Sequence, residues 1–346
     1  MRQENFVDRV GPDTPRISIV IPAYNEQEVL PEFHRRLAAV MNGLSESWEA
    51  VYVNDGSTDS TCEILKELGR SDPRVVLLDL SRNFGKEIAM TAGFDHARGD
   101  AVVVIDADLQ DPPELIREFV REWRQTGVDV VYAKRRARGG ESALKKLTAR
   151  YFYRVIRRMS RVHIPEDTGD FRLMSRRAVE ALRGLREQHR FMKGLFAWIG
   201  FPQKAILYDR DPRLAGATKF DYWKLWNFAL EGITSFTTAP LKIATYIGLF
   251  VASCAFLFGA MIIYKTLVYG DPVAGYPSLI VFVSFLGGTQ LAFIGVLGEY
   301  LGRMFDESKG RPLYFVKDRF IGTDRSIAPA EHLTAKLRPL EQQTAD

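Results

Sequence analysis

The chain has 346 residues, 46% of them hydrophobic and 26% charged, with a formal net charge of +4. This composition excludes a disordered tail and a collagen-like fibre, and the small net charge by itself indicates no partner. Two cysteines, Cys62 and Cys254, are too few for a disulfide framework or a four-thiolate zinc site.

Residues 1–15 are polar and contain no apolar segment of the kind found in secretory signals. We therefore expect the region that follows to remain in the cytosol. From residue 16 to about 136, short β-branched runs alternate with helix-like segments. The runs at 17–21, 50–53, 75–78, 101–105 and 128–131 predict strands, and the segments 26–44, 60–68, 86–97 and 113–126 predict helices. This alternation predicts a doubly wound α/β sheet.

Polar residues follow three of these predicted strands. The runs are Pro22–Glu26 (PAYNE), Asn54–Asp59 (NDGSTD) and Asp106–Asp111 (DADLQD). In open α/β sheets, ligands bind outside the carboxyl ends of the strands, which is where these runs are expected. No GxGxxG motif follows the first strand, so a dinucleotide-binding fold of that type is disfavoured.

Asp106 and Asp108 form the strongest local motif. Two carboxylates flanking a small residue at a strand end can hold one hard divalent cation, Mg²⁺ or Mn²⁺, together with a diphosphate. Gln110 supplies a further oxygen donor. The alternative is a pair of helix-capping carboxylates. Asp55 suits an ordinary turn, but with Tyr24 and Glu26 it could also bind a base and a ribose.

Two segments predict helices at a membrane surface. Lys134–Arg161 holds eleven Lys or Arg residues and one acid, Glu141, and its apolar residues recur at helical spacing, which predicts an amphipathic basic helix at about 142–161. The segment 220–236 is rich in Tyr and Trp, which favour the headgroup layer. The alternatives are a solvated surface helix and a packed aromatic core.

Two stretches, 243–264 and 277–298, carry no charged side chain. Each is long enough to cross roughly 30 Å of hydrocarbon as a helix. The connection between them has few charges, and basic residues follow the second: Arg303, Lys309, Arg311, Lys317 and Arg319. The positive-inside rule then predicts a short external loop and two cytosolic termini.

The separated motifs occur together in one known family. PAYNE, NDGSTD and DADLQ, followed by Arg135, Asp167–Arg172 (DTGDFR), Arg213–Lys219 (RLAGATK) and the two apolar stretches, resemble the inverting family-2 glycosyltransferases of GT-A fold. The overall plan looks like the polyprenyl-phosphate glycosyltransferases, which include dolichol-phosphate mannose synthases and bactoprenol glucosyltransferases. The resemblance covers roughly residues 15–320, and the segment 220–240 looks most like the bactoprenol branch.

The resemblance implies a fold, a domain plan and a reaction. Residues 16–219 would form a cytosolic GT-A domain with a mixed sheet, 220–240 an interfacial helix, 241–301 two transmembrane helices and 302–346 a cytosolic tail. The enzyme would transfer a monosaccharide, expected to be glucose from UDP-glucose, to undecaprenyl or another polyprenyl phosphate at the bacterial plasma membrane. Mg²⁺ or Mn²⁺ would assist, and the anomeric centre would be inverted.

The resemblance also assigns residues. Those expected to contact the nucleotide sugar are Pro22, Tyr24, Glu26, Val53, Asp55, Asp106, Ala107 and Asp108. The expected metal ligands are Asp106, Asp108 and Gln110, the expected phosphate ligands are Arg135, Arg213 and Lys219, and the expected catalytic residues are Asp108, Arg135 and Asp170. For Asp170 three roles remain open: orienting the acceptor, acting as a base, or holding an arginine such as Arg172.

Several alternatives remain open. The Gln-x-x-Arg-Trp motif of the processive polymerases is absent, which disfavours polymer synthesis. The donor could instead be GDP-mannose or a UDP-aminoarabinose derivative. An alternative from another functional class is a non-catalytic membrane scaffold that binds a nucleotide. Lys86, at the start of a predicted helix, suits either a phosphate contact or a plain surface lysine. No nucleic-acid partner is expected, whereas a homo-oligomer remains open.

Overall fold

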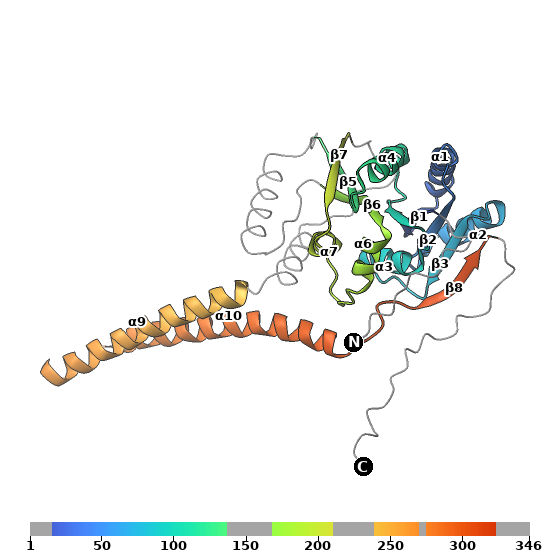
Figure 1. Cartoon of the computed structure of the whole chain (residues 1–346). Helices are drawn as coiled ribbons and strands as arrows, with labels where there is room; N and C mark the ends of the chain where they lie inside the picture. The colour runs from blue at the N-terminus through green and yellow to red at the C-terminus, as the bar shows by residue number, and fades with distance from the viewer. Residues whose placement is uncertain (1–15, 137–167, 210–238, 270–274, 323–346) are drawn as a thin grey trace, which may run out of the picture.

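A computed structural model describes residues 16–136, 168–209, 239–269 and 275–322, which form an α/β domain and two long helices (Figure 1). The strands are β1 (Ile17–Ala23), β2 (Trp48–Asn54), β3 (Val75–Leu80), β4 (Ala101–Val104), β5 (Val130–Arg135), β6 (Thr168–Ser175), β7 (Gln203–Tyr208) and β8 (Val316–Ile321). The helices are α1 (Leu30–Asn42), α2 (Thr61–Ser71), α3 (Lys86–His96), the 3-10 turn η1 (Pro113–Leu115), α4 (Ile116–Thr126), α6 (Arg176–Arg183), α7 (Met192–Trp198), α9 (Ala239–Tyr269) and α10 (Tyr276–Ser308).

The strands form one mixed sheet in the order β7-β5-β6-β4-β1-β2-β3-β8. β1 pairs in parallel with β2 and β4, and β2 pairs in parallel with β3, whereas β6 runs antiparallel to both β4 and β5. The predicted mixed α/β sheet with flanking helices is therefore confirmed. All five strands expected from the sequence are present, with ends shifted by a few residues.

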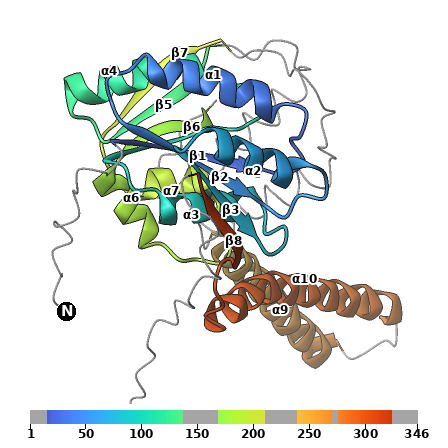
Figure 2. The ribbon, with the colours of Figure 1, turned by 90° about the vertical axis from the view of Figure 1, so that its right-hand side faces the viewer.

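Helices cover both faces of the sheet (Figure 2). β1 shows how one strand serves both layers: Ile19 and Ile21 belong to the core under α1, α2 and α4, while Val20 belongs to the core under α3, α6 and α7. Successive side chains of a strand point to opposite faces, so a continuously apolar strand builds both cores.

Helix α3 lies unusually close to β1 because its inner face is made of small residues. Ala89, Ala92 and Gly93 are buried in the contact. A Cβ atom built on Gly93 would lie 2.2 Å from the Cγ1 atom of Val20. Since α3 begins at Lys86, this close packing also fixes the position of the Lys86 backbone.

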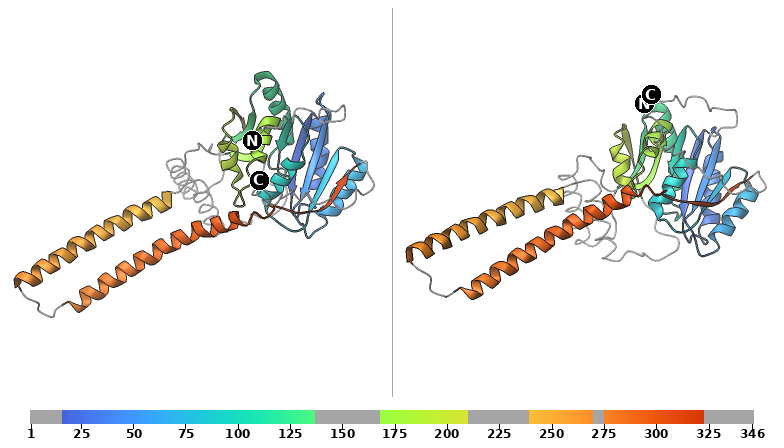
Figure 3. Two further views of the ribbon diagram at one scale, coloured as in Figure 1. Left: turned by 60° about the horizontal axis from the view of Figure 1, so that its bottom comes forward. Right: turned by 90° about the horizontal axis from the view of Figure 1, so that it is seen from below.

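Two apolar helices leave the domain together (Figures 1 and 3). α9 and α10 pack along each other, and the rings of Phe258 and Phe282 stack with centroids 4.8 Å apart. Within the described residues, one stretch, 244–261 in α9, is long and apolar enough to cross a membrane, and none of it is buried. The sequence predicted two such spans, and this test supports the first alone.

After α10 the chain returns to the sheet. β8 pairs antiparallel with β3, with Leu77 opposite Phe320 and Val76 opposite Ile321. Residues 302–346 were expected to be a cytosolic tail, and no strand was predicted within them. Because β8 belongs to the sheet, the end of α10 is tied to the α/β domain.

Several expectations fall outside the described residues. These are the polar segment 1–15, the basic helix at about 142–161, the aromatic segment up to residue 238, the end of the tail from residue 323, and the two phosphate ligands Arg213 and Lys219.

The contact between α3 and β1 gives a first prediction. Gly93→Ala should lower the free energy of unfolding by about 1–3 kcal/mol, because the added methyl group overpacks against Val20 and outweighs the higher helix propensity of alanine. Gly184→Ala is the control, since Gly184 has an ordinary helical φ of −66° and its added Cβ would lie 3.3 Å from the nearest atom, the Ala181 oxygen, against 2.2 Å at Gly93. Thermal or urea unfolding of the full chain measures both variants. Equal stability of Gly93→Ala and Gly184→Ala would contradict the close packing.

Candidate active site

The polar runs after β1, β2 and β4 meet at one edge of the sheet. These three strands are neighbours and run in parallel, so their carboxyl ends lie together. Pro22 stands opposite Val53 in the β1–β2 register. The residues expected to bind the nucleotide sugar are therefore brought together with the acidic run that follows β4.

The loops after β1 and β2 are joined by hydrogen bonds. Ser57 Oγ accepts from the Asn25 amide at 3.0 Å, and Asn25 Oδ1 accepts from the Thr58 amide at 2.9 Å. Thr61 Oγ1 accepts from the Glu26 amide at 2.9 Å. Residues 27–29 form a turn in which the Glu26 carbonyl accepts from the Val29 and Leu30 amides, both at 3.1 Å, and α1 begins at Leu30 rather than at residue 26. The Tyr24 side chain, in the loop after β1, is 42% exposed.

Asp55 connects this pair of loops to a third. Its buried carboxylate accepts from the amides of Phe84 at 2.7 Å and Gly85 at 2.9 Å, in the loop that leads into α3. Burial raises the pKa of the Asp55 carboxyl despite these two donors. Asp55 therefore positions the loop before Lys86, and its expected contact with a nucleotide stays a prediction.

A lysine bridges two carboxylates at the centre of the site. Lys86 Nζ lies 2.7 Å from Asp106 Oδ2, after β4, and 2.6 Å from Asp170 Oδ2, in β6. The sequence placed the two acids in the site but left Lys86 undecided. Its position directly after Gly85, as the first residue of α3, was the available signal, and many surface lysines share it.

The bridge controls the ionisation of its members. Burial raises the pKa of Asp106, whereas for Asp170 the charges of Lys86 and Lys193 more than offset burial and lower the pKa. The pKa of Lys86 is raised because the charges of the two carboxylates outweigh the desolvation of its ammonium group. Asp170 and Lys86 are therefore both charged at neutral pH.

The pKa of Glu87, the residue after Lys86, shifts in the opposite direction to that of Asp170. Burial, reinforced by the charge of Asp170, raises the pKa of the Glu87 carboxyl to about 8. Its Oε2 atom accepts from the Met192 amide at 3.1 Å, which joins α3 to α7. Glu87 is thus a protonated acid near neutral pH, and the sequence analysis did not single it out.

The turn after β4 orients Asp108. Asp108 Oδ1 accepts from the Gln110 amide at 3.1 Å, and the intervening Leu109 is buried with a left-handed φ of 55°. A leucine rarely adopts this conformation, and here its burial in the core holds it. The Asp108 and Gln110 side chains are consequently carried on a fixed turn beside Asp106.

The donor set fits a hard divalent cation. Asp106, Asp108 and Gln110 offer oxygen atoms, the ligand type that Mg²⁺ and Mn²⁺ prefer. Across the described residues, the buried Oδ1 atom of Asp170 has no hydrogen-bond partner. The same part of the chain contains no group of three or more His, Cys, Asp or Glu side chains placed to hold a metal ion by themselves.

Arg135 lies at the same edge, at the end of β5 opposite Tyr208 of β7. Its buried Nε atom has no hydrogen-bond partner within the described part of the chain. The Tyr208 hydroxyl donates to Asp111. Gly169, at the start of β6, lies beside both Asp111 and Arg135, since a Cβ built on it would lie 3.8 Å from an oxygen of the first and a nitrogen of the second.

Arg172 supports the strand that carries Asp170. Its guanidinium donates to the backbone oxygens of Asp170 at 3.2 Å and Gly169 at 2.9 Å, and lies 3.6 Å from the Phe196 ring centroid. Burial lowers the pKa of Arg172 to about 10. The arginine therefore binds the backbone of Asp170, and the Asp170 carboxylate is held by Lys86 instead.

Comparison with known proteins places these residues in a family context. Residues 18–183 match the model of glycosyl transferase family 2. An uncharacterized glycosyltransferase of Synechocystis sp. is 52% identical over 88% of this chain and 96% of its own length. The bactoprenol glucosyl transferase of Shigella phage SfV is 52% identical over 88% of this chain and 98% of its own. Among solved structures, glucosyl-3-phosphoglycerate synthase from Mycobacterium tuberculosis, in complex with Mn²⁺, UDP-glucose and phosphoglyceric acid, aligns with a TM-score of 0.43 and 22% identity over 64% of this chain and 78% of that chain.

The lysine bridge gives a second prediction. Lys86→Met should cost about 1–2 kcal/mol of unfolding free energy, because two carboxylates then face each other without a cation, and the partial exposure of Lys86 limits the loss. Asp170→Asn in the Lys86→Met background should restore part of the lost unfolding free energy, because it removes one of the two facing charges. Lys204→Met, which removes the exposed ion pair with Glu122, is the control. A Lys86→Met protein as stable as this control would contradict the bridge.

Glu87 gives a third prediction, on pH. Because its folded pKa is about 8 and its unfolded pKa is about 4.3, the folded state binds the extra proton, and stability falls as pH rises between these values. Relative to Glu87→Gln, the wild-type chain should lose more than about 1 kcal/mol of unfolding free energy between about pH 5 and pH 8. Unfolding curves at several pH values measure this difference. Parallel pH profiles for the two proteins would contradict the raised pKa.

Proposed function

The chain belongs to glycosyltransferase family 2, and we propose that it transfers glucose from UDP-glucose to the phosphate of a polyprenyl phosphate such as undecaprenyl phosphate. The bactoprenol glucosyl transferases, about half identical to this chain over nearly their whole length, support this choice of acceptor and sugar. The observation that carries the proposal is the acidic group Asp106, Asp108 and Asp170 at the carboxyl edge, in which Lys86 bridges Asp106 and Asp170.

The acidic edge is suited to a nucleoside diphosphate held with a divalent ion. Asp106, Asp108 and Gln110 would bind Mg²⁺ or Mn²⁺, which as a Lewis acid supplies charge neutralisation to the diphosphate leaving group. Lys86 adds a fixed positive charge beside the same carboxylates, and Asp170 holds the ammonium in place. Asp106 and Asp170 together thus keep Lys86 charged and positioned.

The two joined loops would bind the nucleoside. The exposed Tyr24 ring offers a stacking surface, and Pro22 and Val53 lie side by side in the sheet register. Glu26 and Asp55 supply carboxylates for hydroxyl and base hydrogen bonds. Ala107, which is buried between the two aspartates of the β4 turn, brings the backbone close to the sugar diphosphate.

The proposed acceptor needs cations more than it needs a base. A phosphomonoester is largely ionised near neutral pH, with a second pKa of about 6, so its oxygen is already a nucleophile. Arg135, whose Nε atom is buried without a partner in the described part of the chain, is placed to hold such a phosphate, together with Arg213 and Lys219. One direct displacement at the anomeric carbon then inverts its configuration, and no covalent glycosyl-enzyme is required.

We also propose that α9 and α10 both cross the membrane, with the α/β domain and both termini in the bacterial cytosol. Large apolar side chains are exposed along both helices, including Phe256, which is 77% exposed, and Leu291, which is 71% exposed. Soluble proteins rarely expose such continuous apolar surface. The return of the chain to the sheet through β8 ties the end of α10 to the domain, and α9 begins beside that end (Figure 1), which supports an even number of crossings.

The proposal is tested by a transfer assay. The purified full chain, with Mg²⁺, labelled UDP-glucose and undecaprenyl phosphate, should form a labelled lipid. Asp108→Ala should reduce turnover at least about 100-fold, as the loss of key electrostatic stabilisation does in other enzymes. Asp100→Ala is the matched control, because Asp100 is partly exposed and lies just before the amino end of β4.

Three results would count against the proposal. Retained turnover in Asp108→Ala would remove the metal assignment. Product from GDP-mannose but not from UDP-glucose would change the donor. Absence of product with every common UDP- or GDP-sugar would reject transfer to this lipid.

A further inference from the structure

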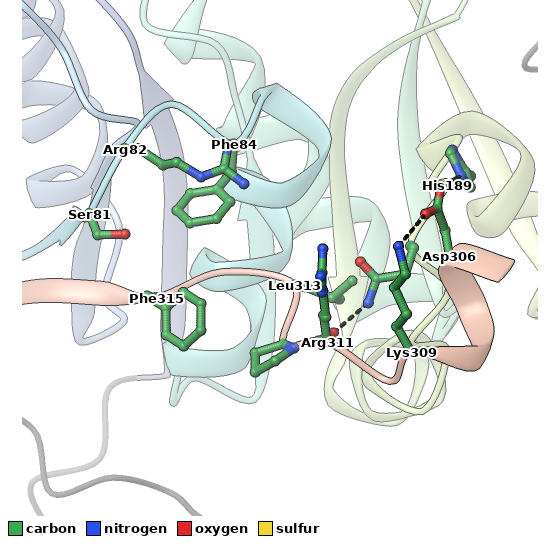
Figure 4. Close-up of a pocket in the computed structure, with 11 residues that line it drawn as sticks. Ser81, Arg82, Phe84, His189, Asp306, Lys309, Arg311, Leu313 and Phe315 are labelled. Carbon is green, nitrogen blue, oxygen red and sulfur yellow. Dashed lines mark hydrogen bonds and ion pairs between the residues drawn. The ribbon is translucent and has the colours of Figure 1, made fainter. Parts of the chain in front are cut away.

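A cavity of about 530 Å³ lies where α10 ends against the α/β domain. One wall is the loop between β3 and α3, with Arg82 and Phe84, and another is the segment after α10, with Lys309, Arg311 and Phe315 (Figure 4). None of these five residues belongs to the acidic site described above. We propose that this cavity binds the phosphate headgroup of an anionic glycerophospholipid, which goes beyond the transfer reaction.

The charge of the lining favours an anion. The lining includes three basic side chains, Arg82, Lys309 and Arg311, and one carboxylate, that of Asp306. His189 Nε2 contacts this carboxylate at 3.1 Å and Lys309 Nζ approaches it at 3.8 Å. Within the described residues, neither Arg82 nor Arg311 forms a salt bridge. Arginine guanidinium groups match phosphate oxygens in a bidentate manner, so two of them at one cavity form a suitable phosphate site.

The place of the cavity favours a lipid as the source of the phosphate. It opens at the end of α10, whose exposed apolar surface includes Met304 and Phe305, 67% and 62% exposed, one turn before Lys309. Phe315, which is 57% exposed, adds an apolar wall. A headgroup phosphate bound by the arginines would leave its acyl chains next to this apolar surface.

The cavity is anchored on both sides. The Gln188 amide donates to Glu307 at 2.7 Å, and the Gln188 side chain donates to the Arg311 carbonyl oxygen. The Ser81 amide, in the wall between β3 and α3, donates to the Phe315 oxygen, in the wall after α10, at 2.9 Å. The two walls are therefore held at a fixed separation by contacts with the domain, as a preformed binding site requires.

The same loop connects the cavity to the active site. Phe84 lines the cavity, and its amide, with that of Gly85, is bound by Asp55. Lys86 follows directly and bridges Asp106 and Asp170. A bound headgroup would thus contact the loop between β3 and α3, which is joined to Asp55 and leads into Lys86. Lipid binding in the cavity would therefore be coupled to the geometry of the active site.

Lipid binding by the full chain in detergent tests the proposal. Isothermal titration calorimetry with dihexanoylphosphatidylglycerol should show saturable binding, and dihexanoylphosphatidylcholine and inorganic phosphate should bind at least about tenfold more weakly. Arg82→Gln with Arg311→Gln should weaken phosphatidylglycerol binding about tenfold or more, since each arginine supplies charge-assisted hydrogen bonds.

The controls separate this inference from the proposed function. Lys66→Gln with Arg319→Gln removes the same charge at a different cavity beside β8 and should leave phosphatidylglycerol binding unchanged. Asp108→Ala should bind the lipid as the wild type does, whether or not it transfers sugar. If the double arginine variant melts early, Arg311→Gln alone should show the same direction of change.

Two outcomes would overturn the inference. Phosphatidylglycerol binding that survives loss of both arginines, or that falls equally in the Lys66 and Arg319 control, would show that the cavity is not the site. Inorganic phosphate binding as tightly as phosphatidylglycerol would reject the lipid as the occupant.

Discussion

The arrangement of the site depends on one electrostatic constraint: carboxylates gathered at the edge of a sheet must be neutralised. Asp106 and Asp170 come from strands that run in opposite directions, and Lys86 at the start of α3 lies within 2.7 Å of both. Without a cation, two acids this close would repel each other and one would take up a proton. The ammonium keeps Asp170 ionised in the absence of any ligand, so the acidic edge is formed before a substrate arrives.

The fold delivers the residues that satisfy this constraint. Parallel pairing of β4, β1 and β2 brings three polar turns to one edge, and the small face of α3 lets the helix approach β1 closely enough to set Lys86 among them. Asp55 then ties the loop before α3 to the turn after β2. Strand β8 pairs with β3 at one edge of the sheet and fixes the end of α10. The apolar helices and the acidic site therefore belong to one connected structure.

The parts that could be predicted from sequence are those with a strong local signal. β1 to β4 are continuous apolar runs because they are buried on both faces. The acidic turn after β4 is easily recognised because its carboxylates directly follow such an apolar run. β6 was missed because Asp170 and Arg172 interrupt its apolar pattern. Asp170 is paired with Lys86, 84 residues earlier in the chain, and Arg172 donates to the nearby backbone oxygens of Asp170 and Gly169. β8 was missed because Lys317, Asp318 and Arg319 look like a solvated tail, and its partner β3 is more than 200 residues earlier. Lys86 has no local feature that distinguishes it from a surface lysine.

The claim tested most directly is that the acidic edge binds a divalent ion together with a nucleoside diphosphate. Electron paramagnetic resonance of Mn²⁺ added to the full chain, with and without UDP, measures this independently of turnover. The account predicts that UDP strengthens Mn²⁺ binding to a single site, and that Asp106→Asn abolishes this binding while the chain stays folded. Mn²⁺ binding that is unaffected by UDP, or that persists unchanged in Asp106→Asn, would contradict it.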